Sequence, residues 1–196
     1  LGFDTAVNTA LDAINKIRDT AISHERVYVV EVMGRNAGFI ALYAGLAGAA
    51  DAILIPEVEP DLDEVVFRVK NATAKGRGHS IVVVAEGLFG NPMSGRTTAE
   101  SSAFKVGNYV MEKTGKDTRI TILGHLQRGG SPSATDRILG TRFGAKAMEQ
   151  LLSGATEQML GWNKNEVTIG PLRDGITKRN QLDLTLLSLA DLLAVT

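Results

Sequence analysis

Short apolar runs without polar alternation are the feature that most limits what this chain can fold into. Three of them span residues 27–32, 51–57 and 80–85, and a shorter one lies at 120–123. Continuous apolar runs of this length are typical of strands that are buried on both faces. Helical patterns separate the runs. We therefore predict an α/β fold, a three-layer α/β/α sandwich with a mostly parallel sheet.

The segments between the strands carry apolar residues at helical spacing. The first of them places Val7, Leu11 and Ile14 on one face, behind a capping residue at Asp4 or Thr5. No repeat or low-complexity segment interrupts the pattern, so one main domain is predicted over residues 1–196. Helices are predicted at about 4–19, 39–48, 61–74, 100–113, 133–151 and 184–193, with a weak strand at 167–169.

The overall composition excludes several classes of function. The net charge of −1 over 196 residues gives no general attraction to nucleic acid or to an anionic membrane. The chain has no cysteine, which excludes disulfides, thiolate metal sites and cysteine nucleophiles. No apolar run reaches the length of a transmembrane helix. We therefore expect a cytoplasmic protein in which any anion site is a local concentration of Arg, Lys and backbone N–H groups.

Polar residues follow two of the apolar runs at the points where the predicted strands end. Met33, Gly34 and Arg35 come after the first strand, and Glu86 comes after the third. Ligands of parallel α/β sheets bind beyond the carboxyl ends of strands, so these residues are candidates for a ligand site. Arg35 and Glu86 each also have a structural explanation that involves no ligand. Arg35 suits the surface of a plain turn, and Glu86 suits a helix cap or a surface ion pair.

The stretch from Arg119 to Arg137 concentrates groups that suit a sugar phosphate. A short apolar strand leads into Gly124, His125 and Arg128, and two glycines and a proline follow before the next helix. The planar guanidinium groups of arginine match phosphate oxygens. A lone histidine is more often a structural hydrogen bonder than a catalyst, so we assign His125 to a ligand oxygen rather than to general base catalysis. The stretch predicts a sugar-phosphate site.

A second basic turn, Lys75-Gly76-Arg77-Gly78-His79, has the composition of a phosphate-binding nest. The alternative is a basic loop that joins a helix to a strand. The sequence contains no P-loop, no G-x-G-x-x-G fingerprint, no metal-ligand cluster and no Ser/His/Asp set. No metal ligand is predicted within the chain.

Together the motifs resemble those of the phosphofructokinase family. The stretch from Arg119 to Arg137 matches the signature of that family throughout. Ser23-His24-Glu25-Arg26, V-V-E-V-M-G-R-N-A-G and V-V-A-E-G follow in the family's order and spacing. The resemblance covers nearly the whole chain and is weakest after about residue 152. The segment from Gly87 to Asp117 is longer than in the compact bacterial enzymes.

The resemblance implies a site for fructose 6-phosphate and a parent enzyme of glycolysis that makes fructose 1,6-bisphosphate. Family members share this site between subunits, which implies a homo-oligomer, a dimer or tetramer, without nucleic-acid or membrane partners. Arg26 and Arg119 would then reach the neighbouring subunit's site. The implied substrate-binding residues are Arg26, Met33, Gly34, Arg35, Glu86, Arg119, His125, Leu126, Gln127 and Arg128.

The resemblance also implies an allosteric nucleotide site. Asp51 stands where the family usually has Glu, and Gly78 stands where Lys is common. These departures leave open whether ADP or phosphoenolpyruvate regulates the enzyme. The implied effector-site residues are Arg18, Ala49, Ala50, Asp51, Lys75, Arg77, Gly78 and His79.

The phosphoryl-donor half of the family's active site is not in this sequence. The G-G-D-G-S-type loop, the magnesium ligand and the T-I-D-N-D segment with the catalytic base would all lie upstream, so the chain is expected to bind sugar phosphate without catalysing transfer. ATP with Mg²⁺ is the expected donor. Pyrophosphate is the alternative, because G-F-D-T-A-V-N-T-A and T-R-F-G-A-K-A also resemble the pyrophosphate-using branch. The rival reading is a non-catalytic, sugar-phosphate-binding regulatory subunit. The tail from about residue 155 is expected to pack on an N-terminal domain.

Overall fold

A computed structural model describes residues 1–21, 25–90, 101–177 and 180–195. They form two compact units. The sheet unit comprises Ala6–Gly130 and Leu182–Thr196, and the hairpin unit comprises Leu1–Thr5 and Ser131–Gln181. Ser23 and His24 of the family motif, and residues 91–100 of the long segment, lie outside the described residues.

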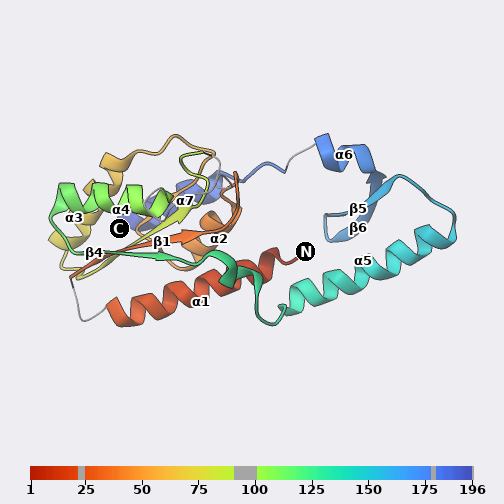
Figure 1. The fold of residues 1–196 in the computed structure, drawn as a ribbon, viewed down its shortest axis with the longest axis horizontal. Helices are drawn as coiled ribbons and strands as arrows, with labels where there is room; N and C mark the ends of the chain where they lie inside the picture. Colours follow the sequence, from red (N-terminus) through yellow and green to blue (C-terminus); the bar gives the residue numbers. More distant parts are fainter. Residues whose placement is uncertain (22–24, 91–100, 178–179, 196) are drawn as a thin grey trace. The chain divides into compact units, whose positions relative to one another are not determined.

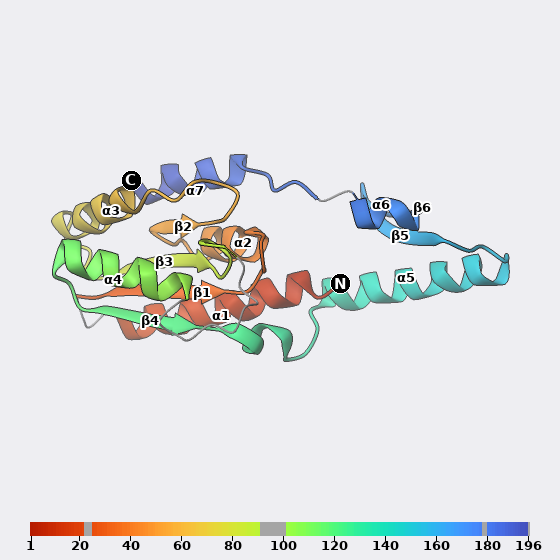
Figure 2. The same cartoon turned by 45° about the horizontal axis from the view of Figure 1, so that its top comes forward.

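The sheet unit (Figure 1) is built on four parallel strands, and Figure 2 shows their order, β2-β3-β1-β4. All residues of β1 and β3 are buried, because these strands are covered on both faces. Strand β4 forms one edge and is half-exposed. The predicted α/β fold with a parallel sheet is confirmed. The strands are β1 (Val27–Val32), β2 (Ala52–Leu54), β3 (Ser80–Ala85) and β4 (Thr118–Ile122).

Helices pack on both faces of this sheet (Figure 2). Ile14 of α1, Leu42 of α2 and Ala190 of α7 belong to the core on one face. Val69 of α3 and Val106 of α4 belong to the core on the other. No helix within the described ranges is long and apolar enough to cross a bilayer. The helices are α1 (Phe3–Ala21), α2 (Phe39–Ala47), α3 (Leu62–Ala74), α4 (Ser102–Thr114) and α7 (Thr185–Val195).

Local capping explains where several elements begin and end. The Asp61 carboxylate accepts a hydrogen bond from Glu64 N at 2.9 Å and begins α3. Ser101 does the same for α4, and Gly115, with φ of +69°, ends it. Strand β2 is shorter than the predicted 51–57 strand and ends before Pro56, which has no N–H to donate to a ladder.

The hairpin unit contains helix α5 (Ala134–Leu152), the antiparallel pair β5 (Gln158–Asn163) and β6 (Glu166–Pro171), and the short helix α6 (Leu172–Thr177). The predicted strand at 167–169 is part of β6, whereas β5 was missed. Lys164 and Asn165 connect the two strands and both have positive φ, as two-residue hairpin turns require. The Asp136 carboxylate accepts hydrogen bonds from Gly2 N at 2.6 Å and Thr5 N at 2.8 Å. These bonds join the first residues of the chain to α5.

Candidate functional site

The carboxyl ends of β1 and β3 border the candidate site. These neighbouring strands run in parallel, with Val32 opposite Ala85. The chain leaves β1 for α2 on one face of the sheet and leaves β3 for α4 on the other. Connections that diverge in this way create a topological switch point, where open α/β sheets bind their ligands. The predicted residues at both strand ends therefore meet at this switch point.

Glu86 links the two strand ends directly. Its Oε1 accepts hydrogen bonds from the backbone N–H groups of Arg35 at 2.7 Å and Gly34 at 3.1 Å. Arg35 has φ of +54°, a left-handed conformation that a non-glycine residue adopts only when its surroundings hold it there. The Glu86 carboxylate thus holds the turn that carries Met33, Gly34 and Arg35.

Glycine permits the close approach of these two loops. A Cβ atom added at Gly87 would lie 1.9 Å from the carbonyl oxygen of Arg35. One added at Gly34 would lie 2.3 Å from the carbonyl oxygen of Ala37. Both neighbours are backbone atoms, so a side chain at either position would displace the turn after β1.

A 3₁₀ helix, η2 (Gly124–Arg128), presents the residues that follow β4. It is anchored to β1 because Leu123 N donates to the carbonyl oxygen of Glu31 at 3.0 Å. His125, Leu126 and Arg128 are exposed, whereas Gln127 is buried. The amide of Gln127 donates to Gly124 O at 3.4 Å, and its Oε1 has no partner among the described residues. Gln127 therefore lies inside the turn in this structure, not on its ligand-facing surface.

Three cationic or potentially cationic side chains follow the carboxyl ends of β1 and β4. Arg35, His125 and Arg128 are exposed, and their side chains make no hydrogen bond or ion pair with any described residue. Strands β1 and β4 are adjacent in the sheet, so their carboxyl ends share one edge. Cationic side chains without a partner, on loops that are anchored by hydrogen bonds to backbone groups, suit an anionic ligand.

Arg26 and Arg119 lie at the opposite end of the sheet. Both pair with Asp117 Oδ2, at 2.7 Å from Arg26 Nε and 3.0 Å from Arg119 Nη2. Hydrogen bonds to Asp117 and to Tyr28 raise the pKa of Arg26. Arg119 is separated from Leu123, the residue before η2, by four residues along β4, roughly 13 Å at 3.3 Å per residue. The structure does not bring these two residues together with Glu86 and Arg128.

A separate pocket of about 150 Å³ gathers most of the predicted effector-site residues. We call it the anion pocket; Arg18, Ala49, Ala50, Asp51 and Arg77 line it. Arg77 Nη1 lies 2.9 Å from Asp51 Oδ1, while Asp51 Oδ2 accepts from Ile81 N at 2.8 Å. Arg18 donates to the carbonyl oxygens of Gly48 and Ala49. Five of the eight predicted residues thus share one cavity.

The remaining three predicted residues lie in the turn and strand entry beside Arg77. Lys75 is the C-cap of α3, and Gly78 has open space around it. Burial of the His79 imidazole and the positive charge of Arg18 lower its pKa, as does Arg77, against the opposing effect of Asp51. The charges of the anion pocket therefore shift the pKa of His79, although His79 does not line the cavity.

Two sets of residues at these sites were missed by sequence reasoning. Ala190, Leu193 and Ala194 of α7 line the anion pocket, and nothing in their Leu/Ala-rich helix signalled it. Glu31 is buried in β1, and its Oε2 accepts from Ala103 N at 2.8 Å, at the start of α4. A carboxylate within an otherwise apolar run was the signal available for Glu31.

The described residues do not offer a complete magnesium site, because no three His, Asp or Glu side chains among them come together. Oxygen ligands from carboxylates are what Mg²⁺ requires from a protein. We therefore derive no step of phosphoryl transfer through a metal held by this chain.

Comparison with known proteins decides the family. The phosphofructokinase family model matches residues 1–151. The chain belongs to the phosphofructokinase family. Its signature stretch and the sheet arrangement described above are those of a phosphofructokinase fold, and the predicted family is confirmed.

The phosphofructokinase relatives are longer than this chain. ATP-dependent 6-phosphofructokinases from Halothermothrix orenii and Bacillus cytotoxicus are 48% and 47% identical over the whole chain. The chain spans 59% and 57% of their lengths.

Solved structures show the same fold. That of phosphofructokinase from Saccharomyces cerevisiae has a TM-score of 0.78 at 34% identity, covering 96% of this chain and 24% of that one. A pyrophosphate-dependent phosphofructokinase from Marinobacter aquaeolei has a TM-score of 0.72 at 24% identity, covering 92% of this chain and 48% of that one. At that identity the second likeness concerns the fold alone.

Proposed function

We propose that this chain supplies the fructose 6-phosphate site of an ATP-dependent 6-phosphofructokinase, which acts in glycolysis in the cytoplasm. One observation carries the proposal: Glu86 holds the Arg35 turn at the switch point, where the side chains of Arg35, His125 and Arg128 make no hydrogen bond or ion pair with any described residue. The names of the relatives at 47–48% identity support ATP rather than pyrophosphate as the donor. Mg²⁺ is proposed with it, because metal ions neutralise the developing charge in phosphoryl transfer.

Each group has a defined part in binding the sugar phosphate. Arg128 and His125 hold the 6-phosphate, since a guanidinium fork gives strong, directional bonds to phosphate oxygens. A carboxylate has two oxygens with several acceptor sites, so Glu86 can hold the turn and also accept from a sugar hydroxyl. Met33, Gly34 and Arg35 face the sugar. Leu126 and Gln127 shape the η2 turn that presents the two phosphate ligands. In phosphoryl transfer such positioning is a large part of catalysis.

Arg26 and Arg119 serve the site of a neighbouring subunit in this proposal. Their position at the amino end of the sheet, around Asp117, puts them out of reach of their own Arg128. A homo-oligomer, a dimer or tetramer, would bring two such ends together. The anion pocket is proposed as the regulatory site, with Arg18 and Arg77 as its cations.

Replacing Arg128 by alanine in the full-length protein tests the main proposal. Loss of a charge-assisted phosphate contact costs about 1.5–3 kcal/mol, so the KM for fructose 6-phosphate should rise at least tenfold while the KM for the donor stays unchanged. Arg142→Ala is the matched control, because Arg142 lies on α5 and stacks on Trp162. An unchanged sugar-phosphate KM in Arg128→Ala would refute the assignment.

Calorimetry on this chain tests the sugar-phosphate site, and a phosphoryl-transfer assay of the full-length protein separates the enzyme from the rival regulatory subunit. The chain should bind fructose 6-phosphate without turning it over. Full-length protein that binds the sugar phosphate but transfers no phosphoryl group from ATP or pyrophosphate would favour a regulatory subunit.

A further inference from the structure

Glu31 is the single charged residue of strand β1, and only 7% of its surface is exposed. A carboxylate is costly to bury unless hydrogen bonds hold it. Because side chains alternate along a strand, Glu31 points to the same face of the sheet as Val27 and Val29, which belong to the core that α4 covers. There its Oε2 accepts a hydrogen bond from Ala103 N at 2.8 Å.

The start of helix α4 is therefore held by two acceptors from distant parts of the chain. Ser101, the N-cap, accepts from Phe104 N at 3.3 Å. Glu31 accepts from Ala103 N, another of the N–H groups that a helix leaves unpaired in its first turn. A carboxylate also suits the positive end of the helix dipole. The Glu31 side chain thus fixes where α4 begins relative to β1.

Ser102, the first residue of α4, connects the helix to the loop after β3. It is fully buried, and its Oγ donates to the carbonyl oxygen of Glu86 at 3.0 Å. The carboxylate of Glu86 in turn accepts from the N–H groups of Gly34 and Arg35. A series of hydrogen bonds therefore runs from Glu31, through the first turn of α4, to Glu86 and the turn after β1.

The 3₁₀ helix η2 is attached to Glu31 in a different way. Leu123 N donates to the backbone carbonyl oxygen of Glu31 at 3.0 Å, and η2 with His125 and Arg128 follows directly. That contact belongs to the main chain, so it survives replacement of the Glu31 side chain. The side chain of Glu31 therefore supports Glu86, whereas its main chain holds η2.

We propose that Glu31 and Ser102 are positioning residues that set the affinity of the site for the sugar without changing its affinity for the phosphate group. This inference rests on the proposed function, in which Glu86 and Arg35 meet the sugar and Arg128 meets the 6-phosphate. Binding groups must be held close to their productive positions by the side chains around them, and the start of α4 does this for Glu86. Both residues are buried and act through Glu86, so neither contacts the ligand.

The Ser102→Ala variant of the full-length protein is the most direct test, because it removes only the hydroxyl that holds Glu86. The Kd for fructose 6-phosphate, measured by calorimetry, should rise about twofold to tenfold, as expected for the loss of one hydrogen bond between uncharged groups. The inhibition constant of inorganic phosphate, measured as a competitor of fructose 6-phosphate, should stay unchanged because phosphate needs only η2. Glu31→Gln keeps an acceptor for Ala103 N and should raise the Kd less than Glu31→Leu does.

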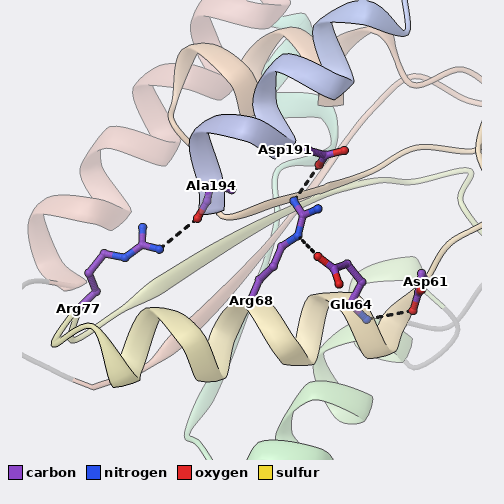
Figure 3. Close-up of polar contacts among 6 residues, drawn as sticks. All are labelled: Asp61, Glu64, Arg68, Arg77, Asp191 and Ala194. Atoms are coloured by element: carbon purple, nitrogen blue, oxygen red, sulfur yellow. Dashed lines mark hydrogen bonds and ion pairs between the residues drawn. The ribbon is translucent and has the colours of Figure 1, made fainter. Parts of the chain in front are cut away.

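Asp61→Ala is the matched control. Asp61 caps α3, which packs on the same face of the sheet as α4, through the hydrogen bond from Glu64 N. Figure 3 shows this cap beside the ion pair between Glu64 and Arg68. Its loss should lower stability, as the loss of a helix cap does, but should change neither the Kd for fructose 6-phosphate nor the inhibition constant of phosphate.

The possible outcomes separate this proposal from the proposed function. If the wild-type protein binds fructose 6-phosphate and Ser102→Ala binds it equally well, the positioning role is refuted and the sugar-phosphate site stands. A rise of equal size in the Kd and in the phosphate inhibition constant also refutes the role, because the effect would then extend to η2. If Glu31→Leu does not fold, Ser102→Ala alone decides. If the wild-type protein does not bind fructose 6-phosphate, the proposed function is refuted and the positioning role with it.

Discussion

Glu86 Oε1 accepts a hydrogen bond from the backbone N–H of Arg35 at 2.7 Å, beyond the carboxyl ends of the paired strands β3 and β1. The contact joins two loops that are 51 residues apart in the chain. Because Arg35 has positive φ, its position depends on this support. Glu86 is therefore a structural acceptor for the turn as well as a proposed ligand of the sugar.

Replacing Glu86 by glutamine should loosen the turn after β1. The neutral amide makes weaker hydrogen bonds to the N–H groups of Gly34 and Arg35 than the carboxylate does, and loses about 1.5 kcal/mol or more. The KM for fructose 6-phosphate should rise at least tenfold in steady-state assays. Glu57→Gln is the control, since Glu57 accepts from Gly38 N in the next turn of the same loop, at 2.8 Å. It should lower stability without a comparable change in KM.

Replacing Gly87 by alanine should disturb the same turn sterically. The added Cβ would meet the carbonyl oxygen of Arg35 at 1.9 Å, and neither atom belongs to a flexible side chain. We expect a loss of stability of about 1–3 kcal/mol together with weaker sugar-phosphate binding. Denaturant unfolding and calorimetry measure the two effects. Gly78→Ala, where the added atom meets open space and φ is not in the left-handed region, should be nearly neutral. Equal stability of both variants would contradict the close approach.

Mixed oligomers test whether Arg119 serves a neighbouring subunit. Subunits with Arg119→Ala should have little activity alone, and so should subunits with Arg128→Ala. Mixing and reassembling them should restore part of the activity, because some interfaces would then combine an intact Arg119 with an intact Arg128 from another chain. Activity that stays at the level of the separate variants after verified subunit exchange would exclude the shared arrangement.

His79 should make stability depend on pH in a defined direction. Burial and the charges of Arg18 and Arg77 hold its pKa below the ordinary value of 6.5, with Asp51 opposing them. The unfolded chain then binds the proton more tightly than the folded protein, so stability is fully present above pH 6.5 and falls as the pH drops below it. Urea unfolding at pH 7.5 and 5.5 measures the difference.

The His79→Gln variant provides the matching comparison. Its stability should fall less between those two pH values than that of the wild-type protein. If the stability of His79→Gln depended on pH in the same way as that of the wild type, burial and the charges of the anion pocket would not lower the pKa of the His79 imidazole.

Local patterns were enough to predict the sheet and the strand-end residues. The apolar runs at 27–32 and 80–85 are typical of strands covered on both faces, and parallel strands put Arg35 and Glu86 at one edge of the sheet. The missed strand β5 has a different cause. Gln158–Asn163 is half-exposed and contains a central glycine, so it carries no alternation or buried run to detect. Only pairing with β6 makes it a strand.

The sequence by itself determined the family, the α/β fold and the residue types available for binding an anion, because these depend on short-range spacing and on side-chain chemistry. Tertiary structure alone decided what those residues touch. It separated Arg119 from Arg128 along β4, buried Gln127 within η2, and brought α7 beside Arg18 and Arg77. The physical reason is that contacts between distant segments follow from packing and register, which no local pattern encodes. The Glu86–Arg35 hydrogen bond is the clearest case, since neither residue's neighbours in sequence predict the other.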